Sequence, residues 1–211
     1  MTYLIRGARL NGADAADLIV DGGVIAEVGT GLSRAGATVV DADGLVALPG
    51  LVDLHTHLRE PGYEASETIL TGSRAAAAGG FTTVFAMPNT SPVADTAGVV
   101  EQELALGEAA GYAHVQPIGA VTVGQKGERL AELGAPASSR ARGRGFSDDG
   151  FCVFDPLIMR RALEYVKAFD GVVAQHAQDP RLTEGAQMNE GTVSAELGLS
   201  LIHISEPPRP Y

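Results

Sequence analysis

Apolar residues follow one rhythm up to about residue 48 and a different rhythm after it. In the first part they form short β-branched runs, separated by turn-forming residues such as Asn11-Gly12 and Asp43-Gly44. Residues 18–26 are typical of a β-hairpin around Asp21-Gly22-Gly23, where glycine can supply the positive φ angles of the turn. The pattern predicts a small β-sheet domain over residues 1–48, which we expect to be a β-sandwich.

From residue 49 onward, short apolar runs alternate with alanine-rich segments. The apolar runs predict strands at residues 51–55, 82–87, 115–121, 144–147 and 172–176. The intervening segments predict helices at residues 66–78, 95–110 and 157–169, the last two with Asp95 and Asp155 as N-terminal caps. Strands that alternate with helices in this way are typical of βαβ units in a parallel sheet.

The expected fold class is therefore α/β, with an incomplete (β/α)8 barrel of the TIM type after the small β-domain. A complete barrel needs about 250 residues, so residues 49–200 can supply its first five βα units only. The last segment, residues 201–211, contains three prolines and looks unrelated to the units before it.

Composition and charge exclude several classes of function. A net charge of −11 would repel nucleic acids and anionic membranes, so we expect neither as a partner. The chain has no apolar run of about 18 residues and no signal-peptide pattern at its start, which favours a cytoplasmic protein. The single cysteine, Cys152, excludes an intrachain disulfide and a cysteine-based zinc cluster. Histidine and carboxylate side chains remain as metal ligands.

Two histidines at the end of the first predicted barrel strand are the strongest chemical signal. His55 and His57 are two residues apart, so in an extended strand both imidazoles point to the same face and can bind one cation. Arg59 continues the alternation and would place a guanidinium beside the metal, where it could hold a substrate carboxylate. A pair of histidines with this spacing also occurs by chance, as ordinary half-buried residues.

Polar residues also stand at the ends of three later strands. Asn89 follows the second strand, Asp148 and Asp149 follow the fourth, and His176 ends the fifth. In a (β/α)8 barrel these strand ends form the rim where the active site is built. Asn89 could donate an amide hydrogen bond to substrate, or belong to an ordinary turn. His176 could be a ligand or a buried structural histidine. Asp148 and Asp149 cannot both face the metal from an extended strand, so one of them orients or caps.

Several motifs together resemble the amidohydrolase superfamily, and within it the bacterial monofunctional dihydroorotases that have a bridging aspartate. The matching residues are those of His55-Thr-His-Leu-Arg-Glu-Pro-Gly62, Gly79-Gly-Phe-Thr-Thr83, Met87-Pro-Asn-Thr90, Phe146-Ser-Asp-Asp-Gly150, and His176 with Asp179. The likeness runs from residue 1 to about residue 199.

The resemblance implies a zinc enzyme that interconverts N-carbamoyl-L-aspartate and L-dihydroorotate in pyrimidine biosynthesis. It implies two zinc ions, with His55 and His57 on the first, His176 on the second and Asp149 between them. Asp149 is preferred to Asp148 because its distance in sequence from His176 agrees with the family. Arg59 and Asn89 would hold the carboxylate of a small-molecule substrate. The resemblance leaves open a homo-oligomer or an association with aspartate transcarbamoylase.

The family has a further histidine ligand and an acid/base aspartate on later strands, and both would fall past Tyr211. We therefore assign no catalytic acid or base to this chain and expect it to be an inactive, C-terminally truncated form of an active enzyme. Two alternatives stay open. One is a sister cyclic amidohydrolase such as an allantoinase or dihydropyrimidinase, and the other is a non-catalytic dihydroorotase-like subunit that scaffolds aspartate transcarbamoylase.

Overall fold

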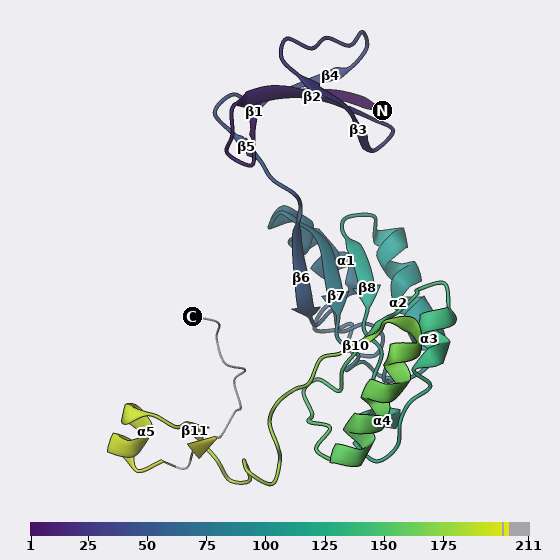
Figure 1. The fold of residues 1–211 in the computed structure, drawn as a ribbon, viewed down its shortest axis with the longest axis vertical. Helices are drawn as coiled ribbons and strands as arrows, with labels where there is room; N and C mark the ends of the chain where they lie inside the picture. The colour runs from purple at the N-terminus through teal and green to yellow at the C-terminus, as the bar shows by residue number, and fades with distance from the viewer. Residues whose placement is uncertain (200, 203–211) are drawn as a thin grey trace. The chain divides into compact units, whose positions relative to one another are not determined.

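Residues 1–199 and 201–202 are described by a computed structural model, shown in Figure 1. The chain divides into two units, Met1–Gly50 and Leu51–Tyr211, so the first unit ends two residues beyond the boundary expected from the sequence. Apart from Leu201 and Ile202, the tail predicted over residues 201–211 lies outside the described residues.

The first unit is one β-sheet. Its strands are β1 (Thr2–Leu10), β2 (Ala15–Asp21), β3 (Val24–Gly29), β4 (Thr38–Asp41) and β5 (Val46–Ala47). They lie in the order β3-β2-β1-β4, with β5 also paired to β1. The predicted hairpin joins β2 to β3, and Gly22 and Gly23 in its turn have φ angles of 58° and 84°. The described residues of this unit supply no second layer, so the β-sandwich stays a prediction.

Five parallel strands form two sheets of the second unit, which an isolated bridge connects. They are β6 (Leu51–Thr56), β7 (Phe81–Ala86), β8 (His114–Pro117), β9 (Gly145–Phe146) and β10 (Val172–Val173). The pairs β6-β7, β7-β8 and β9-β10 are all parallel, and an isolated bridge between Gly119, two residues after β8, and Phe146 connects this segment to β9. The five strands are thus neighbours in chain order, as successive βα units require. The carboxyl ends of all five strands consequently lie along one edge.

Three of these strands are shorter than the sequence predicts. β8 ends at Pro117 rather than near residue 121, because proline has no N–H to continue the ladder. The pairing resumes beyond it, since Gly119 N donates to Gly145 O at 3.0 Å and Ser147 N donates to Gly119 O at 2.9 Å. These bonds keep the segment after β9, which carries Asp148 and Asp149, in line with the other strand ends.

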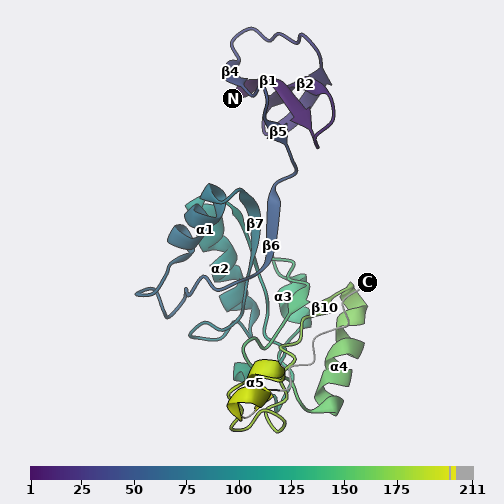
Figure 2. The same ribbon diagram turned by 90° about the vertical axis from the view of Figure 1, so that its left-hand side faces the viewer.

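Helices connect the strands, and two of them lie side by side against the sheet of β6, β7 and β8 (Figure 2). The main ones are α1 (Ile69–Ala78), α2 (Ala97–Ala110) and α4 (Pro156–Val166), the last extended by a 3-10 turn, η2 (Lys167–Phe169). Shorter elements are η1 (Val123–Gln125), α3 (Gly134–Ser138), β11 (Met188–Asn189), α5 (Thr192–Leu197) and β12 (Leu201–Ile202). No helix among the described residues is long and apolar enough to cross a membrane.

Of the two N-terminal caps predicted from the sequence, one is confirmed and the other is wrong. Asp155 caps α4 as predicted, and its Oδ1 accepts from Leu157 N at 2.7 Å. The residue before α2 is Thr96 and not Asp95, so that prediction is wrong. The Asp95 carboxylate accepts instead from Gly124 N at 2.8 Å, which ties the start of α2 to the η1 loop.

Two apolar clusters fix the helices on the sheet. Leu58, Ile69, Val84 and Val115 form a buried cluster between α1 and the strands β7 and β8. Around β9, a second cluster contains Val121, Leu133, Phe146, Ala162 and Val166. Gly107 lets α2 approach β8, since a Cβ atom at this position would lie 2.6 Å from Val115 Cβ. The strand ends therefore project from a packed scaffold.

Candidate metal centre

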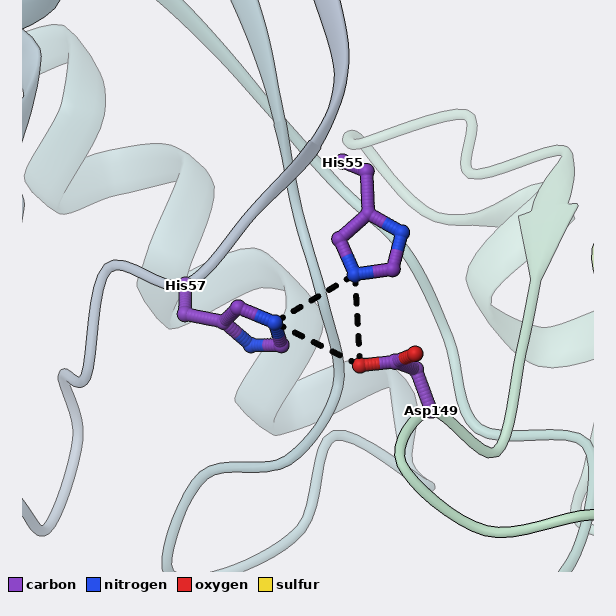
Figure 3. Close-up of side chains that lie close together, drawn as sticks. All are labelled: His55, His57 and Asp149. Atoms are coloured by element: carbon purple, nitrogen blue, oxygen red, sulfur yellow. Dashed lines mark hydrogen bonds and ion pairs between the residues drawn. The ribbon is translucent and has the colours of Figure 1, made fainter. Parts of the chain in front are cut away.

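The side chains of His55, His57 and Asp149 converge on one point at the carboxyl ends of β6 and β9. His55 is the penultimate residue of β6, His57 follows that strand directly, and Asp149 follows β9. The Nε2 atoms of the two histidines lie 3.3 Å apart, and they lie 3.3 Å and 3.4 Å from Asp149 Oδ2. Figure 3 shows both ring nitrogens directed at this one carboxylate oxygen. The three ligand atoms are all within 4.8 Å of one another.

His176 approaches the other oxygen of the same carboxylate. Its Nδ1 atom lies 3.3 Å from Asp149 Oδ1. The sequence places His176 at the end of a strand, and the structure places it three residues beyond β10 on the same edge. Asp149 therefore stands between two histidines on one oxygen and a third histidine on the other.

Hydrogen bonds to the backbone hold Asp149 in this position. Its N–H donates to Ser147 Oγ at 3.1 Å, and its carbonyl oxygen accepts from Gln125 Nε2 at 2.7 Å. The Asp149 side chain is only 9% exposed, whereas that of His55 is 54% exposed. A mostly buried carboxylate beside more exposed imidazoles forms a site that is open on the histidine side. Gln125 belongs to no recognisable motif, so its contact with Asp149 could not be predicted from the sequence.

Asp148 points away from the histidines and anchors a neighbouring loop. Its Oδ1 accepts from Val121 N at 2.8 Å and Thr122 N at 3.0 Å, and its Oδ2 accepts from the Thr122 hydroxyl. Asp148 is 1% exposed, and burial raises the pKa of its carboxyl group, against these hydrogen bonds. Of the two adjacent aspartates, Asp149 faces the histidines and Asp148 orients the segment that carries it.

Asn89 contacts His57 on the side away from the cluster. Its Oδ1 lies 3.0 Å from His57 Nδ1. When Nδ1 carries the ring hydrogen and donates to Asn89, the lone pair of Nε2 is left facing Asp149, which is how outer partners orient metal-binding histidines. The sequence predicts Asn89 on this rim as a substrate contact but does not reveal its contact with His57. The available signal was that His57 follows β6 and Asn89 follows β7, because these two strands are neighbours.

Arg59 reaches this region by a turn and not by strand alternation. β6 ends at Thr56, and Arg59 has a φ angle of 60°, so the extended geometry expected for it is wrong. The turn is fixed from both sides, because Glu60 Oε2 accepts from Ile69 N at 2.8 Å and Ser91 N donates to Pro61 O at 2.9 Å. The Arg59 guanidinium makes no ion pair or hydrogen bond to another described residue. It is half-buried and free to meet an anion.

A cavity of about 170 Å³ opens beside the cluster. His55, Asp149 and His176 line it together with Met87, Ser147 and Gln175. Neither Arg59 nor Asn89 is among its lining residues. Since its lining includes one histidine from each side of the Asp149 carboxylate, a small molecule within it would lie beside His55 and His176.

The donor set suits zinc. Imidazole nitrogen and carboxylate oxygen are common zinc ligands, and a site with few protein ligands leaves coordination positions for water or substrate. An aspartate whose two oxygens face separate ligand groups has the arrangement that bridges a pair of cations. The residues present therefore fit a hydrolytic metal centre.

Known proteins with similar sequences are dihydroorotases. The profile of the family described as Dihydro-orotase-like matches residues 44–206, which reaches into the tail that looked unrelated. The dihydroorotase of Leifsonia xyli is 77% identical over 94% of this chain and 45% of its own length. That of Streptomyces coelicolor is 71% identical over 93% of the chain and 46% of its own length. The dihydroorotase of Mycobacterium tuberculosis is 54% identical over 95% of the chain and 47% of its own length.

Solved structures with a similar fold include hydantoinases and dihydropyrimidinases. L-hydantoinase from Arthrobacter aurescens superposes with a TM-score of 0.72 at 21% identity, covering 87% of this chain and 42% of that one. Dihydropyrimidinase from Brevibacillus agri gives a TM-score of 0.66 at 22% identity, covering 87% and 41%. These likenesses show a shared α/β fold. The chain spans about half the length of the curated relatives it matches. From the match over residues 44–206 and the identity to these relatives, the chain belongs to the dihydro-orotase-like family.

Proposed function

We propose that this chain forms the metal-binding part of a dihydroorotase, an enzyme that converts L-dihydroorotate reversibly to N-carbamoyl-L-aspartate in pyrimidine biosynthesis. The position of Asp149, with His55 and His57 at one oxygen and His176 at the other, is the observation that carries the proposal. The identity of 45–77% to proteins named dihydroorotase supports this reaction over those of other cyclic amidohydrolases.

Two zinc ions are the proposed cofactor. His55 and His57 would hold the first ion and His176 the second, with Asp149 contributing one oxygen to each. When bound, zinc supplies an activated water and polarises the amide carbonyl of the substrate. Gln125 and Ser147 keep Asp149 in place through its backbone, and Asn89 keeps the His57 ring turned toward it. These contacts fix the ligands before any ion arrives.

Arg59 and Asn89 are the proposed contacts of the substrate carboxylate. A guanidinium binds carboxylate with two parallel hydrogen bonds. The Asn89 Oδ1 atom is taken by His57, which leaves the Asn89 amide hydrogens for an acceptor on substrate. The bond from Ser91 N to Pro61 O fixes the turn of Arg59 to the loop of Asn89, so both donors keep a constant spacing.

The matched residues make up less than half of each relative, so we propose the activity for a protein that also contains the unmatched part. In that protein the five parallel strands would belong to a complete (β/α)8 barrel. A dihydropyrimidinase is not favoured, since the solved hydantoinases and dihydropyrimidinases are only 20–25% identical. A cytoplasmic location, and assembly as a homo-oligomer or with aspartate transcarbamoylase, are further proposals.

The proposal is tested by measuring formation of L-dihydroorotate from N-carbamoyl-L-aspartate. A protein of the relatives' full length that contains these residues should be active with zinc, lose activity to a chelator and regain it on addition of zinc. We expect the 211-residue chain alone to bind zinc without turnover. Activity of the longer protein that is insensitive to chelation would count against the proposal, and turnover by the chain alone would show that the unmatched part is not needed.

A further inference from the structure

A carboxylic acid is buried in α2, away from the metal centre. Glu103 is 0% exposed, and its helix neighbours Val100 and Leu104 belong to a buried apolar cluster with Ala94 and Ala141. Its Oε2 has no hydrogen-bond partner among the described residues, and its Oε1 lies 3.4 Å from Thr90 Oγ1. Burial raises the pKa of Glu103 well above the usual range for a carboxyl group, so the neutral form, which has an O–H to donate, is favoured.

Among the described residues, Thr90 is the only one whose side chain lies within hydrogen-bond distance of the Glu103 carboxyl group. Its hydroxyl has a single hydrogen, and the best-placed acceptor is Pro92 O at 2.8 Å. Pro88 O lies at 3.5 Å. With that hydrogen used toward Pro92, the oxygen of Thr90 can accept a hydrogen bond from neutral Glu103. The backbone N–H of Thr90 donates to Pro88 O at 2.9 Å, so Thr90 joins α2 to both ends of the loop formed by residues 88–92.

The same loop carries residues of the candidate site. Asn89 precedes Thr90 and contacts His57 Nδ1 at 3.0 Å. Ser91 follows Thr90, and its N–H donates to Pro61 O in the turn that carries Arg59. The loop packs so closely on this turn that a Cβ atom on Gly62 would clash with Ser91. A shift of the loop would therefore reach His57 and Arg59 together.

We propose that Glu103 is a positioning residue, whose neutral carboxyl group donates to Thr90 and holds the 88–92 loop where Asn89 can orient His57. The inference rests on the proposed function, because His57 is a ligand only if the metal centre is real. It explains why a carboxylic acid occupies an apolar position of α2, where leucine would fill the space without burying a polar group.

Two substitutions separate a donor role from simple packing. Glu103→Gln keeps the shape and offers an amide N–H to Thr90, whereas Glu103→Leu keeps the bulk and removes the donor. If Glu103 only fills space, Glu103→Leu should leave the loop unchanged and stabilise the fold, since it removes an unsatisfied polar group. If Glu103 positions the loop, Glu103→Leu should loosen it while Glu103→Gln restores it.

Amide hydrogen exchange of the 211-residue chain without metal gives the first measurement. The amides of Ser91 and Ala94, bonded to Pro61 O and Pro88 O, should exchange at least about tenfold faster in Glu103→Leu and within about twofold of the original in Glu103→Gln. The Met159 amide in α4, bonded to Asp155 O, is the control and should not change. Unchanged protection of the Ser91 and Ala94 amides in Glu103→Leu would overturn the proposal. An equal loss of protection in Glu103→Leu and Glu103→Gln would also overturn it.

The second measurement is the zinc affinity, determined by competition with a chromophoric chelator. We expect Glu103→Leu to weaken zinc binding about tenfold and Glu103→Gln by less than about twofold, in line with other partners outside the ligand shell. If the original chain binds no zinc, the proposed function fails, while hydrogen exchange still decides the role of Glu103. If Glu103→Leu does not fold, Thr90→Val replaces it. Retained loop protection in Thr90→Val overturns the proposal, and loss there with retention in Glu103→Gln supports it.

Discussion

The Nδ1 atom of His176 lies 3.3 Å from Oδ1 of Asp149, on the opposite side of the carboxylate from His55 and His57. This relationship joins strand ends that are far apart in sequence. It requires β10 to lie next to β9, and the two strands do pair, with Val173 opposite Phe146. A single aspartate between two groups of imidazoles is what a pair of cations would need.

Substitution of Asp149 should abolish the second metal and weaken the first. Asp149→Asn keeps the shape but removes the negative charge and one of the two acceptor oxygens. We expect the zinc stoichiometry of the chain, measured by equilibrium dialysis and elemental analysis, to fall below that of the original with affinity reduced at least about 100-fold. Asp14→Asn, at an exposed position of the first unit, is the matched control and should bind as the original does. Equal zinc binding in Asp149→Asn would show that Asp149 is not a ligand.

Loss of Asn89 should weaken zinc binding without removing a ligand. Asn89→Ala leaves His57 Nδ1 without its partner, so the ring can turn and its Nε2 no longer faces Asp149. Zinc affinity is expected to fall about 10-fold to 100-fold with the stoichiometry unchanged. Asn189→Ala, exposed in β11, serves as the control. Normal affinity in Asn89→Ala would mean that its contact with His57 has no part in metal binding.

Asp148 should matter for stability more than for metal binding. Its side chain accepts two backbone N–H bonds and the Thr122 hydroxyl, and in Asp148→Asn an amide group would replace one acceptor oxygen and face a donor. The free energy of unfolding, measured by urea denaturation, should fall by about 1.5–3 kcal/mol. Asp155→Asn is the comparison, because asparagine caps a helix about as well as aspartate and should change the stability by less than about 0.5 kcal/mol. A similar small effect at both positions would contradict the anchoring role of Asp148.

The buried acid should give the chain a pH dependence that Glu103→Gln removes. Glu103 has a pKa in the folded state above its unfolded value near 4.5, so the folded state binds the proton more tightly. Its contribution is fully present below the unfolded pKa and is lost as pH rises through the folded pKa. The free energy of unfolding of Glu103→Gln minus that of the original chain should therefore increase above about pH 4.5 and level off once the folded pKa is passed.

Urea denaturation at a series of pH values checks this difference. Glu128→Gln, at an exposed position, should differ from the original by an amount that is almost independent of pH. A flat difference for Glu103→Gln would mean that the carboxyl group of Glu103 keeps an ordinary pKa in the folded chain.

Local sequence predicted the elements of this fold well, and it predicted contacts between them less well. Asp155-Pro156 marks the start of α4, and the His55-Thr56-His57 spacing brings two imidazoles together at the end of β6. The path of Arg59 was missed because a positive φ angle at a residue other than glycine leaves no pattern in a sequence.

Contacts between buried polar side chains could not be predicted from the sequence either. Glu103 lies in an alanine-rich helix, where a glutamate is normally expected on the solvent side. Only the packing of α2 against the 88–92 loop shows that its side chain is buried beside Thr90. The contact between Asn89 and His57 likewise depends on how the two loops approach each other, which spacing along the chain does not reveal.

An anomalous difference map at the zinc absorption edge would show whether Asp149 lies between two zinc ions. Crystals of the chain grown with zinc should show one peak about 2.0–2.2 Å from His55, His57 and Asp149 Oδ2, and a second at a similar distance from His176 and Asp149 Oδ1. The absence of any peak in contact with Asp149 in a zinc-saturated crystal would show that Asp149 is not a zinc ligand.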